Sequence, residues 1–429
     1  MKTLATKTPD FPTRFAALLD RATTAPDVTA TVREIIERVR NEGDTALLDY
    51  TERFDRQTLT PETMRVTRDE ISAAVAQTPK HLREALSLAA KRIEAFHRAQ
   101  LPRDIELSDS TGALTGLRWG PLDAAGLYVP GGKASYPSSV LMNAIPAKVA
   151  GVRRIAMVVP APDGVLNPLV LAAAAEAGVT EIYRVGGAQA VAALAYGTAS
   201  IRPVDRIVGP GNAYVAEAKR QVFGKVGIDS IAGPSEVLIL ADDGNNPTHI
   251  AMDLLAQAEH DEDAQSILIT DSGALAAAVE NAVASLLTNL PRAAIAGESW
   301  RRHGAIILVR DWNEAVDLAN RIAPEHLQLM LAEPDFVFRQ IRHAGAIFLG
   351  KNTPEAMGDY VAGPNHVLPT SGTARFASGL SVHDFMKRTT WVSLPHHALE
   401  ALGPAAVALA EAEGLTAHAG SVAVRLGKP

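Results

Sequence analysis

Apolar residues follow two different spacings along the chain. In the first hundred residues they recur every three or four positions, as in TVREIIERVRNEG from Thr31 and HLREALSLAAKRIEAFHRA from His81. This spacing predicts amphipathic helices, because positions three or four apart share one helix face. We therefore expect a helical lead-in, of which residues 1–25 form an N-terminal helical segment.

From Ala125 onwards, short apolar runs that end in glycine or proline alternate with alanine-rich helix patterns. This alternation is typical of a parallel sheet. The predicted strands form two series, 125–130, 153–160, 181–186 and 204–209, then 235–242, 266–271, 304–310, 326–331 and 345–350. The pattern predicts an α/β fold with two Rossmann-like parallel-sheet domains, and two such domains imply a cleft between them.

The breaks between the two series predict the domain boundaries. We expect residues 26–124 and 235–380 to form one α/β domain and residues 125–234 the other, followed by a small C-terminal tail domain over 381–429. That tail contains a predicted helix at 404–414. The Gly- and Pro-rich stretch after Gly350 predicts a functional loop, because long loops inside compact domains are uncommon.

Charge and composition exclude several classes of function. The net charge is −7 and Lys and Arg are scattered, which argues against nucleic acid or an anionic membrane surface as a partner. The opening MKTLATKTPDFPTRF lacks the apolar core of a signal peptide, and no apolar run approaches a spanning helix, so we expect a cytoplasmic protein. The chain has no cysteine, so any metal site must use histidine, carboxylate and amide ligands.

Three glycine-rich turns follow predicted strands of the first series. They are YVPGGKASYPSS (128–139), VGGAQA (185–190) and VGPGNAY (208–214), while the dinucleotide fingerprint G-x-G-x-x-G is absent. Glycine lets the backbone approach a phosphate, and a helix N-terminus favours an anion. Each turn alone could equally be a tight connection, but three together indicate nucleotide binding at the carboxyl ends of the strands.

Gln257 and His260 form a candidate pair for metal binding. They lie three residues apart where a helix pattern ends, so an amide oxygen and a ring nitrogen could converge on one ion. The alternative is a solvated polar face. Asp359 in MGDYVAGPNH and His418 in TAHAG could complete the shell, because each lies among small residues, although a turn residue and an exposed tail residue would look the same.

Glu325 and His326 form the second polar pair, at the start of an apolar strand in RIAPEHLQLML. Adjacent strand residues point to opposite faces, but both can reach one cleft at a strand end. The ordinary pKa of histidine, near 6.5, suits a proton acceptor at neutral pH. The alternative is a surface histidine beside a solvated glutamate.

Taken in order, these motifs resemble the histidinol dehydrogenase family. The resemblance runs from Gly126 to Ala419, most of the chain. The matching stretches are GLYVPGG, VGGAQAVAALAYGT, VGPGNAYV, AGPSEVL, LLAQAEHD, APEHLQL, GDYVAGPNHVLPT, ARFASGLSV and EAEGLTAHA.

The resemblance implies roles for individual residues. It implies the zinc ligands Gln257, His260, Asp359 and His418, a set of ligands that Mn²⁺ or Co²⁺ could also occupy. It implies Glu325 and His326 as general bases, and Ser235 and Glu413 as further substrate contacts beside His326 and the zinc ligands. It implies NAD contacts at Tyr128, Gln189 and Asn212, on the three glycine-rich turns.

The resemblance also implies the reaction. It is the oxidation of L-histidinol through histidinal to L-histidine with two NAD⁺, the last step of histidine biosynthesis, in a homodimer whose exchanged C-terminal tail places Glu413 and His418 in the partner's site. Without a thiol nucleophile, water must attack the aldehyde. The alternatives are a related zinc and NAD dehydrogenase of another small polar alcohol, a solute-binding module and a zinc hydrolase.

Overall fold

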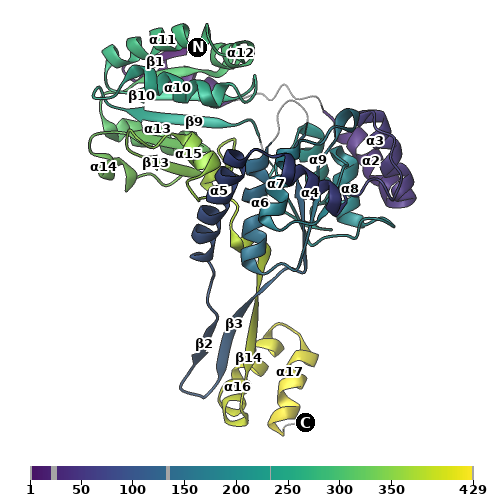
Figure 1. The fold of residues 1–429 in the computed structure, drawn as a ribbon. Helices are drawn as coiled ribbons and strands as arrows, with labels where there is room; N and C mark the ends of the chain where they lie inside the picture. Colours follow the sequence, from purple (N-terminus) through teal and green to yellow (C-terminus); the bar gives the residue numbers. More distant parts are fainter. Residues whose placement is uncertain (1, 21–26, 132–135, 232, 428–429) are drawn as a thin grey trace.

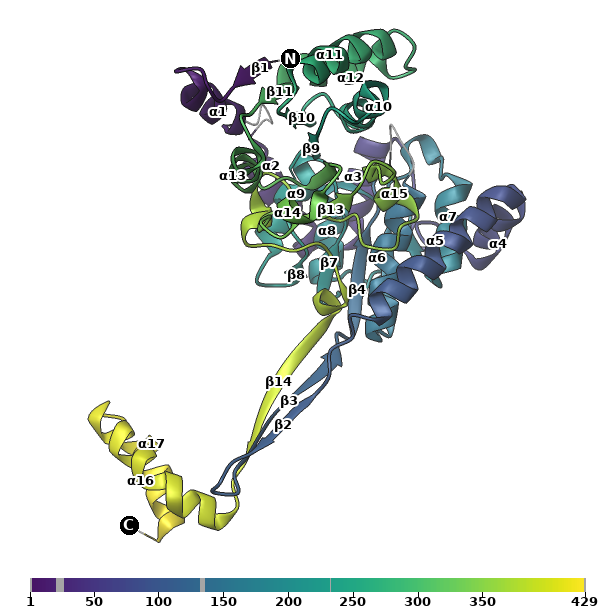
Figure 2. The ribbon, with the colours of Figure 1, turned by 90° about the vertical axis from the view of Figure 1, so that its left-hand side faces the viewer.

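The computed structural model of the chain describes residues 2–20, 27–131, 136–231 and 233–427. Two helix-covered sheets lie beside each other, and a narrow arm projects from them (Figures 1 and 2). The residues at 132–135, in the first glycine-rich turn, and at 21–26, around the first expected domain boundary, lie outside the described ranges.

The first sheet has six parallel strands, in the order β1-β11-β10-β9-β12-β13. Its strands are β1 (Lys2–Ala5), β9 (Glu236–Ala241), β10 (Gln265–Thr270), β11 (Ala305–Leu308), β12 (His326–Met330) and β13 (Ala346–Leu349). His326 is in register with Val237 of β9 and Ala346 of β13, so it lies at the amino end of the sheet, on the strand next to the edge strand β13.

Helices cover both faces of the six-stranded sheet. Leu238 and Leu240 pack toward one face, whereas Val237 and Ile239 pack toward the other, as expected for a strand that is buried on both sides. The first face is covered by α1 (Phe11–Leu19), α13 (Trp312–Ile322) and α14 (Pro334–Phe338); the second by α10 (Pro247–Ala258), α11 (Gly273–Leu287) and α12 (Ala293–His303). The short helix α15 (Glu355–Tyr360) contacts α10 and β12.

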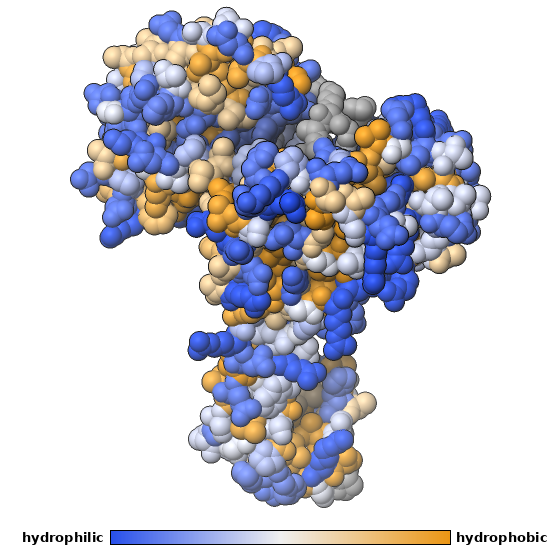
Figure 3. Space-filling view, in the orientation of Figure 1, coloured by the Kyte–Doolittle hydropathy of each residue, from blue (hydrophilic) through white to orange (hydrophobic). Residues whose placement is uncertain are grey.

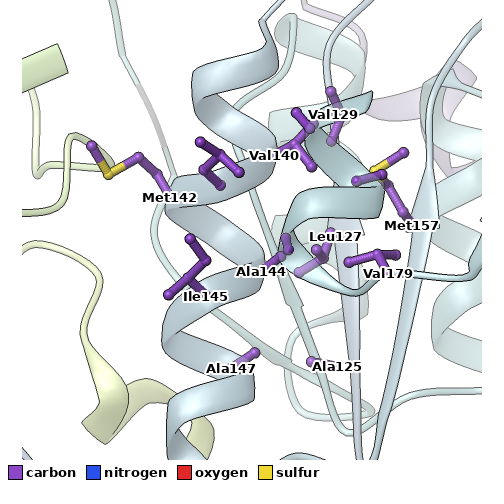
Figure 4. Close-up of a cluster of buried hydrophobic side chains, with 14 of the residues drawn as sticks. Ala125, Leu127, Val129, Val140, Met142, Ala144, Ile145, Ala147, Met157 and Val179 are labelled. Atoms are coloured by element: carbon purple, nitrogen blue, oxygen red, sulfur yellow. The ribbon is translucent and has the colours of Figure 1, made fainter. Parts of the chain in front are cut away.

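The second sheet has five parallel strands, in the order β6-β5-β4-β7-β8. Its strands are β4 (Ala124–Tyr128), β5 (Arg154–Val158), β6 (Glu181–Tyr183), β7 (Arg206–Val208) and β8 (Gly227–Ile228), and its connecting helices are α6 (Pro137–Ala150), α7 (Pro168–Ala177), α8 (Gly187–Tyr196), α9 (Ala213–Val222) and the 3₁₀ turn η1 (Pro162–Gly164). Leu127 and Val129 meet Val140 and Ala144 of α6 in a core free of solvent (Figure 4).

The helices of the N-terminal third pack on this five-stranded unit. They are α2 (Thr29–Glu42), α3 (Asp44–Asp55), α4 (Arg68–Gln77) and α5 (Lys80–Arg98). Helices α2 and α3 contact α8, whereas α4 and α5 contact α7 and α6. These contacts differ from the expected grouping of residues 26–124 with 235–380, because helix periodicity identifies an apolar face but not the surface that covers it.

The N-terminal segment and the C-terminal tail also differ from expectation. Segment 1–25 begins with a strand, β1, which pairs with β11; four residues are too few to show a strand pattern. The tail shares an antiparallel sheet with residues far earlier in the chain, in the order β14-β3-β2. The arm consists of β2 (Ile105–Ser108), β3 (Leu114–Pro121), β14 (Met386–Ser393), α16 (His396–Ala412), α17 (Thr416–Ala423) and the 3₁₀ turn η4 (Val424–Leu426), while η2 (Thr373–Arg375) and η3 (Val382–Phe385) lead into it.

The arm exposes many apolar side chains to solvent, visible as orange atoms in the lower part of Figure 3. Its exposed large apolar residues are Ile105, Leu107, Val392, Leu394, Leu402, Leu409, Leu415 and Val424. Apolar surface of this kind often marks a protein–protein contact.

The predicted α/β fold is confirmed. Every strand predicted in the two series is present, with ends that differ by a few residues. Among the described residues, no helix is both long enough and apolar enough to cross a membrane.

Candidate active site

A cleft of about 1350 Å³ lies between the two sheets. The five-stranded sheet meets it with the turns that follow its strands, through Tyr128 after β4 and Asn212 after β7. The six-stranded sheet lines the cleft with the amino ends of its strands, through Ser235 before β9 and Glu325 before β12. The expected position at the carboxyl ends of strands therefore holds for one sheet only.

The backbone of Glu236 holds Glu325 and His326 at the start of β12. The Glu236 backbone N–H donates to Glu325 Oε2 at 2.8 Å. The ring nitrogen His326 Nδ1 lies 3.0 Å from the Glu236 carbonyl oxygen, which can only accept, so Nδ1 carries the proton. In a neutral ring Nε2 is then the basic nitrogen, and it has no hydrogen-bond partner in the described structure.

Three carboxylates surround the His326 ring. Glu325 Oε2 and Glu355 Oε2 lie 3.6 Å and 3.9 Å from Nδ1, and Asp359 Oδ1 lies 3.7 Å from Nε2. Burial opposes the charged ring, but these carboxylates outweigh it and raise the pKa of His326. Burial also raises the pKa of Glu325, so the pair holds a proton near neutral pH.

Gln257 and His260 lie at the C-terminal end of α10. The Gln257 side chain is buried, and its Nε2 lies 3.3 Å from His260 Nδ1. The Gln257 oxygen Oε1 is buried without a hydrogen-bond partner, whereas the His260 ring is exposed at the cleft wall. An unpaired buried amide oxygen is costly unless something occupies it, which is what a bound cation would do.

Asp359 on α15 supplies the carboxylate of this group. Burial alone would favour its neutral form, but interaction with the His326 ring, whose Nε2 lies 3.7 Å from Asp359 Oδ1, lowers the pKa of Asp359, so it stays ionised. An amide oxygen, an imidazole and an ionised carboxylate fit the donor preferences of Zn²⁺. Within the described ranges, His, Cys, Asp and Glu side chains form no group of three or more that could hold a metal ion.

Glu413 and His418 do not join this cleft. Glu413 follows α16 and His418 lies on α17, both exposed to solvent. Figures 1 and 2 show these helices at the far end of the arm. One copy of the chain therefore brings Gln257, His260 and Asp359 together without the fourth expected ligand.

The three residues on the glycine-rich turns have different surroundings. The Tyr128 hydroxyl accepts a hydrogen bond from the Gly187 backbone at 3.0 Å, which links the first turn to the second. Asn212 caps α9 by accepting from the Tyr214 and Val215 backbone. Gln189 is buried on α8 and does not line the cleft, although its Oε1 has no hydrogen-bond partner.

Comparisons with known proteins point to one family. The profile of the histidinol dehydrogenase family matches residues 19–426. The chain is 62% identical over 429 residues to the histidinol dehydrogenase of Gluconobacter oxydans, covering all of both chains. It is also 62% identical over 421 residues to that of Rhodospirillum rubrum, covering 98% of this chain and 97% of the relative.

The chain belongs to the histidinol dehydrogenase family. It is therefore an oxidoreductase. The crystal structure of the histidinol dehydrogenase from Elizabethkingia anophelis superposes with a TM-score of 0.95 at 38% identity, covering all of this chain and 98% of that one.

Gln328 connects two helices of the candidate site and was not predicted from the sequence. Gln328 Nε2 donates to Asp253 Oδ2 of α10 at 2.8 Å, and Gln328 Oε1 accepts from the Glu355 backbone of α15 at 2.9 Å. It thereby joins the helix that carries Gln257 to the helix that carries Asp359. Strand spacing could have found it, because Gln328 shares a face of β12 with His326.

Two other members of the site were missed as well. Glu355 lies one helical turn before Asp359, a spacing that places both carboxylates on one face of α15. His366 Nδ1 bonds the Asp359 backbone oxygen at 2.9 Å, and its Nε2 lies 3.4 Å from Ser139 Oγ. It therefore connects α15 to α6 across the cleft, a contact that no local spacing reveals.

Proposed function

We propose that the protein oxidises L-histidinol through histidinal to L-histidine, the last step of histidine biosynthesis, with one Zn²⁺ per subunit and two NAD⁺ per turnover. The observation that carries this proposal is that His260 and Asp359 line one cleft with the Glu325–His326 pair, opposite the glycine-rich turns, and that Gln257 Nε2 lies 3.3 Å from His260 Nδ1. A cytoplasmic location, where NAD⁺ is available, accords with this reaction.

His326 is the proposed acceptor of the alcohol proton. Its Nδ1 is committed to the Glu236 carbonyl, so once the ring is neutral, Nε2 takes the alcohol proton while hydride passes to the first NAD⁺. The products of this step are histidinal, NADH and one proton. Zn²⁺, when bound by Gln257, His260 and Asp359, would supply a Lewis acid that orients the imidazole and amino nitrogens of the substrate.

Glu325 is the proposed base of the second step. It removes a proton from water, whose oxygen adds to the aldehyde carbon and gives the hydrate as its alkoxide, with the proton kept on Glu325. Loss of hydride from this alkoxide to a second NAD⁺ gives the carboxylic acid. His326, after releasing its first proton to solvent, accepts the hydroxyl proton and leaves the carboxylate. The chain has no cysteine to provide a thiol for this step.

The proposed NAD⁺ contacts are Tyr128, Gln189 and Asn212. Two of them line the cleft, and the helix N-termini of α6, α8 and α9 follow the three turns, which favours the negative pyrophosphate. Because Gln189 is buried, it would act after a change of side-chain position or through the backbone of its turn.

We also propose a homodimer in which the partner's arm brings Glu413 and His418 to this cleft, beside Ser235. The exposed apolar side chains of the arm and the incomplete ligand group of a single copy support this arrangement. An exchanged arm of this kind is a common route to symmetric dimers.

The yield of NADH from a limiting, known amount of L-histidinol tests the reaction. We expect two NADH per histidinol when absorbance is followed to completion. A yield of one would mean that the aldehyde escapes and that the role of Glu325 is wrong. No NADH from histidinol would favour a related dehydrogenase of another small polar alcohol.

Mixing two inactive variants tests the exchanged arm. His260→Ala and His418→Ala chains, unfolded together and refolded, should regain about a quarter of wild-type activity, because half of the dimers are mixed and each has one intact site. Mixing without subunit exchange is the control. Activity no higher than that of the separate variants would contradict the exchange.

A further inference from the structure

A buried ion pair lies beneath the third glycine-rich turn, and the proposed reaction gives it no role. Lys219 on α9 and Asp229, which follows β8, form this pair with side chains only 3% and 5% exposed. Buried charges are costly unless they are paired and hydrogen-bonded. Neither residue belongs to a motif identified from the sequence.

Both side chains form hydrogen bonds with the backbone of Gly209. Lys219 Nζ donates to the Gly209 carbonyl at 3.0 Å, and the Gly209 N–H donates to Asp229 Oδ2 at 2.7 Å. Gly209 has φ +114°, and a Cβ there would lie 2.1 Å from the Tyr128 carbonyl oxygen. The peptide groups of Gly209 are therefore fixed from both sides, against the end of β4.

The residues that follow Gly209 form the wall of the cleft. Pro210, Gly211 and Asn212 all line it, and Asn212 begins α9 as its N-cap. Lys219 lies two helical turns further along α9, so the pair ties the start of the turn to the body of the helix that the turn introduces. This arrangement restricts the turn before any ligand arrives.

We infer that Lys219 and Asp229 are positioning residues, which hold the turn at 208–212 in the conformation that binds the dinucleotide. The inference rests on the proposed function, because it takes this turn to contact NAD⁺. Restricting a binding loop in its bound conformation raises affinity by lowering the ordering cost of binding. Lys219 also lines the cleft, so direct contact with a phosphate is the competing role; its bonds to Asp229 and Gly209 favour positioning.

Binding of NADH to four variants tests the inference. The variants are Lys219→Met, Asp229→Asn, their double combination, and Arg154→Met as the control. Arg154 pairs with Glu181 at 3.1 Å and also donates to two backbone carbonyls, but it lies at the start of β5, the other end of the same sheet. The readouts are the NADH dissociation constant from fluorescence, the zinc affinity and the melting temperature.

For both single variants we expect NADH binding about tenfold weaker, with zinc affinity unchanged. The double variant should lose less than the product of the two single effects, because the two residues act as one unit. Arg154→Met should lower the melting temperature and leave NADH binding unchanged. The double variant buries no unpaired charge, so it keeps the test valid if a single variant fails to fold.

Three outcomes would overturn the inference. Unchanged NADH binding in folded single or double variants would mean that the pair serves stability alone. Weaker binding in Lys219→Met with tighter binding in Asp229→Asn would mean that Lys219 contacts the ligand directly. Wild-type protein that binds no NADH would contradict the proposed function itself, and the positioning role with it.

Discussion

The two sheets line the cleft with opposite ends of their strands. The five-stranded sheet presents the carboxyl ends of its strands, where α6, α8 and α9 begin, and the six-stranded sheet presents the amino ends of its strands, where α10 ends (Figure 1). A helix N-terminus carries partial positive charge and a helix C-terminus partial negative charge. One wall therefore favours an anion and the other a cation.

This difference separates the tasks of the two walls. On the six-stranded side, Gln257 and Asp359 offer oxygen donors beside a cluster of carboxylates. On the five-stranded side, glycine-rich turns offer backbone N–H groups. The same connection, a strand followed by a helix, can thus serve a metal or a dinucleotide according to which of its ends faces the ligand.

The largest expected effect on the six-stranded side follows from Glu325→Gln. We expect aldehyde oxidation to fall by a factor of about 10²–10⁴, as for removal of a general base, while alcohol oxidation falls much less. Single-turnover assays with histidinol and with histidinal, compared with His97→Asn, another buried residue remote from the cleft, provide the measurement. Equal losses in both half-reactions would mean that Glu325 is not the specific base of the hydration step.

The same variant should change the dependence on pH. Burial raises the pKa of Glu325 well above its ordinary 4.5, and the ionised form is the base, so the wild-type aldehyde step should accelerate as pH rises through this raised value. Glu325→Gln should lack this acceleration. A rise that persists in the variant would assign the titration to another group.

A smaller effect is expected from Gln328→Leu, which disconnects α10 from α15. Zinc affinity should fall about tenfold, because Gln257 and Asp359 lose their common support, while NADH binding stays unchanged. Competition with a chelator measures the zinc affinity. Gln265→Leu, at the buried start of β10, is the control. An equally large loss of zinc affinity in this control would mean that replacing any buried glutamine of the sheet weakens zinc binding, so the connection made by Gln328 would not be the cause.

The smallest effect is expected at the carboxyl edge of the six-stranded sheet, away from the cleft. Glu314 accepts from the Arg310 backbone at 2.9 Å and from Thr6 Oγ1 at 2.6 Å, and so joins the ends of β11 and β1. The hydrogen bond from the Arg310 side chain to Oε1 lowers the pKa of Glu314 to about 2. Glu314→Gln should cost about 1 kcal/mol at neutral pH without altering either ligand.

The pH dependence of that cost has a definite sign. A lowered pKa in the folded state stabilises it fully above the ordinary value of 4.5, and this stabilisation is lost as pH falls toward 2. The difference in melting temperature between wild type and Glu314→Gln should therefore narrow below about pH 4.5. A difference that stays constant down to about pH 3 would mean that shape, not charge, sets the effect.

The parts of the fold that the sequence predicts are those with repeated local patterns. The strands of both series and helices such as α5 have periodic apolar positions, and they are present as expected. The pairing of α2 to α5 with the five-stranded sheet and the arm built from β2, β3 and β14 depend on contacts between distant segments. No local spacing encodes such contacts.

The residues of the candidate site also differ in whether local spacing predicts them. Gln257 with His260, and Glu325 with His326, are neighbours in the chain, so their spacing alone indicated a site. Asp359 was a candidate because of its small neighbours, which an ordinary turn residue shares, and Gln328 went unnoticed because its partners come from two other elements. The direction in which each sheet faces the cleft also depends on packing and not on sequence pattern.

The separation of the two walls is tested most directly by the affinity for NADH with and without metal. Fluorescence titration of zinc-loaded protein, metal-stripped protein and Gln257→Leu should give the same dissociation constant for NADH, because the proposed dinucleotide contacts lie on the five-stranded side. Loss of NADH binding on removal of the metal, or in Gln257→Leu, would contradict the separation and make the two walls a single interdependent site.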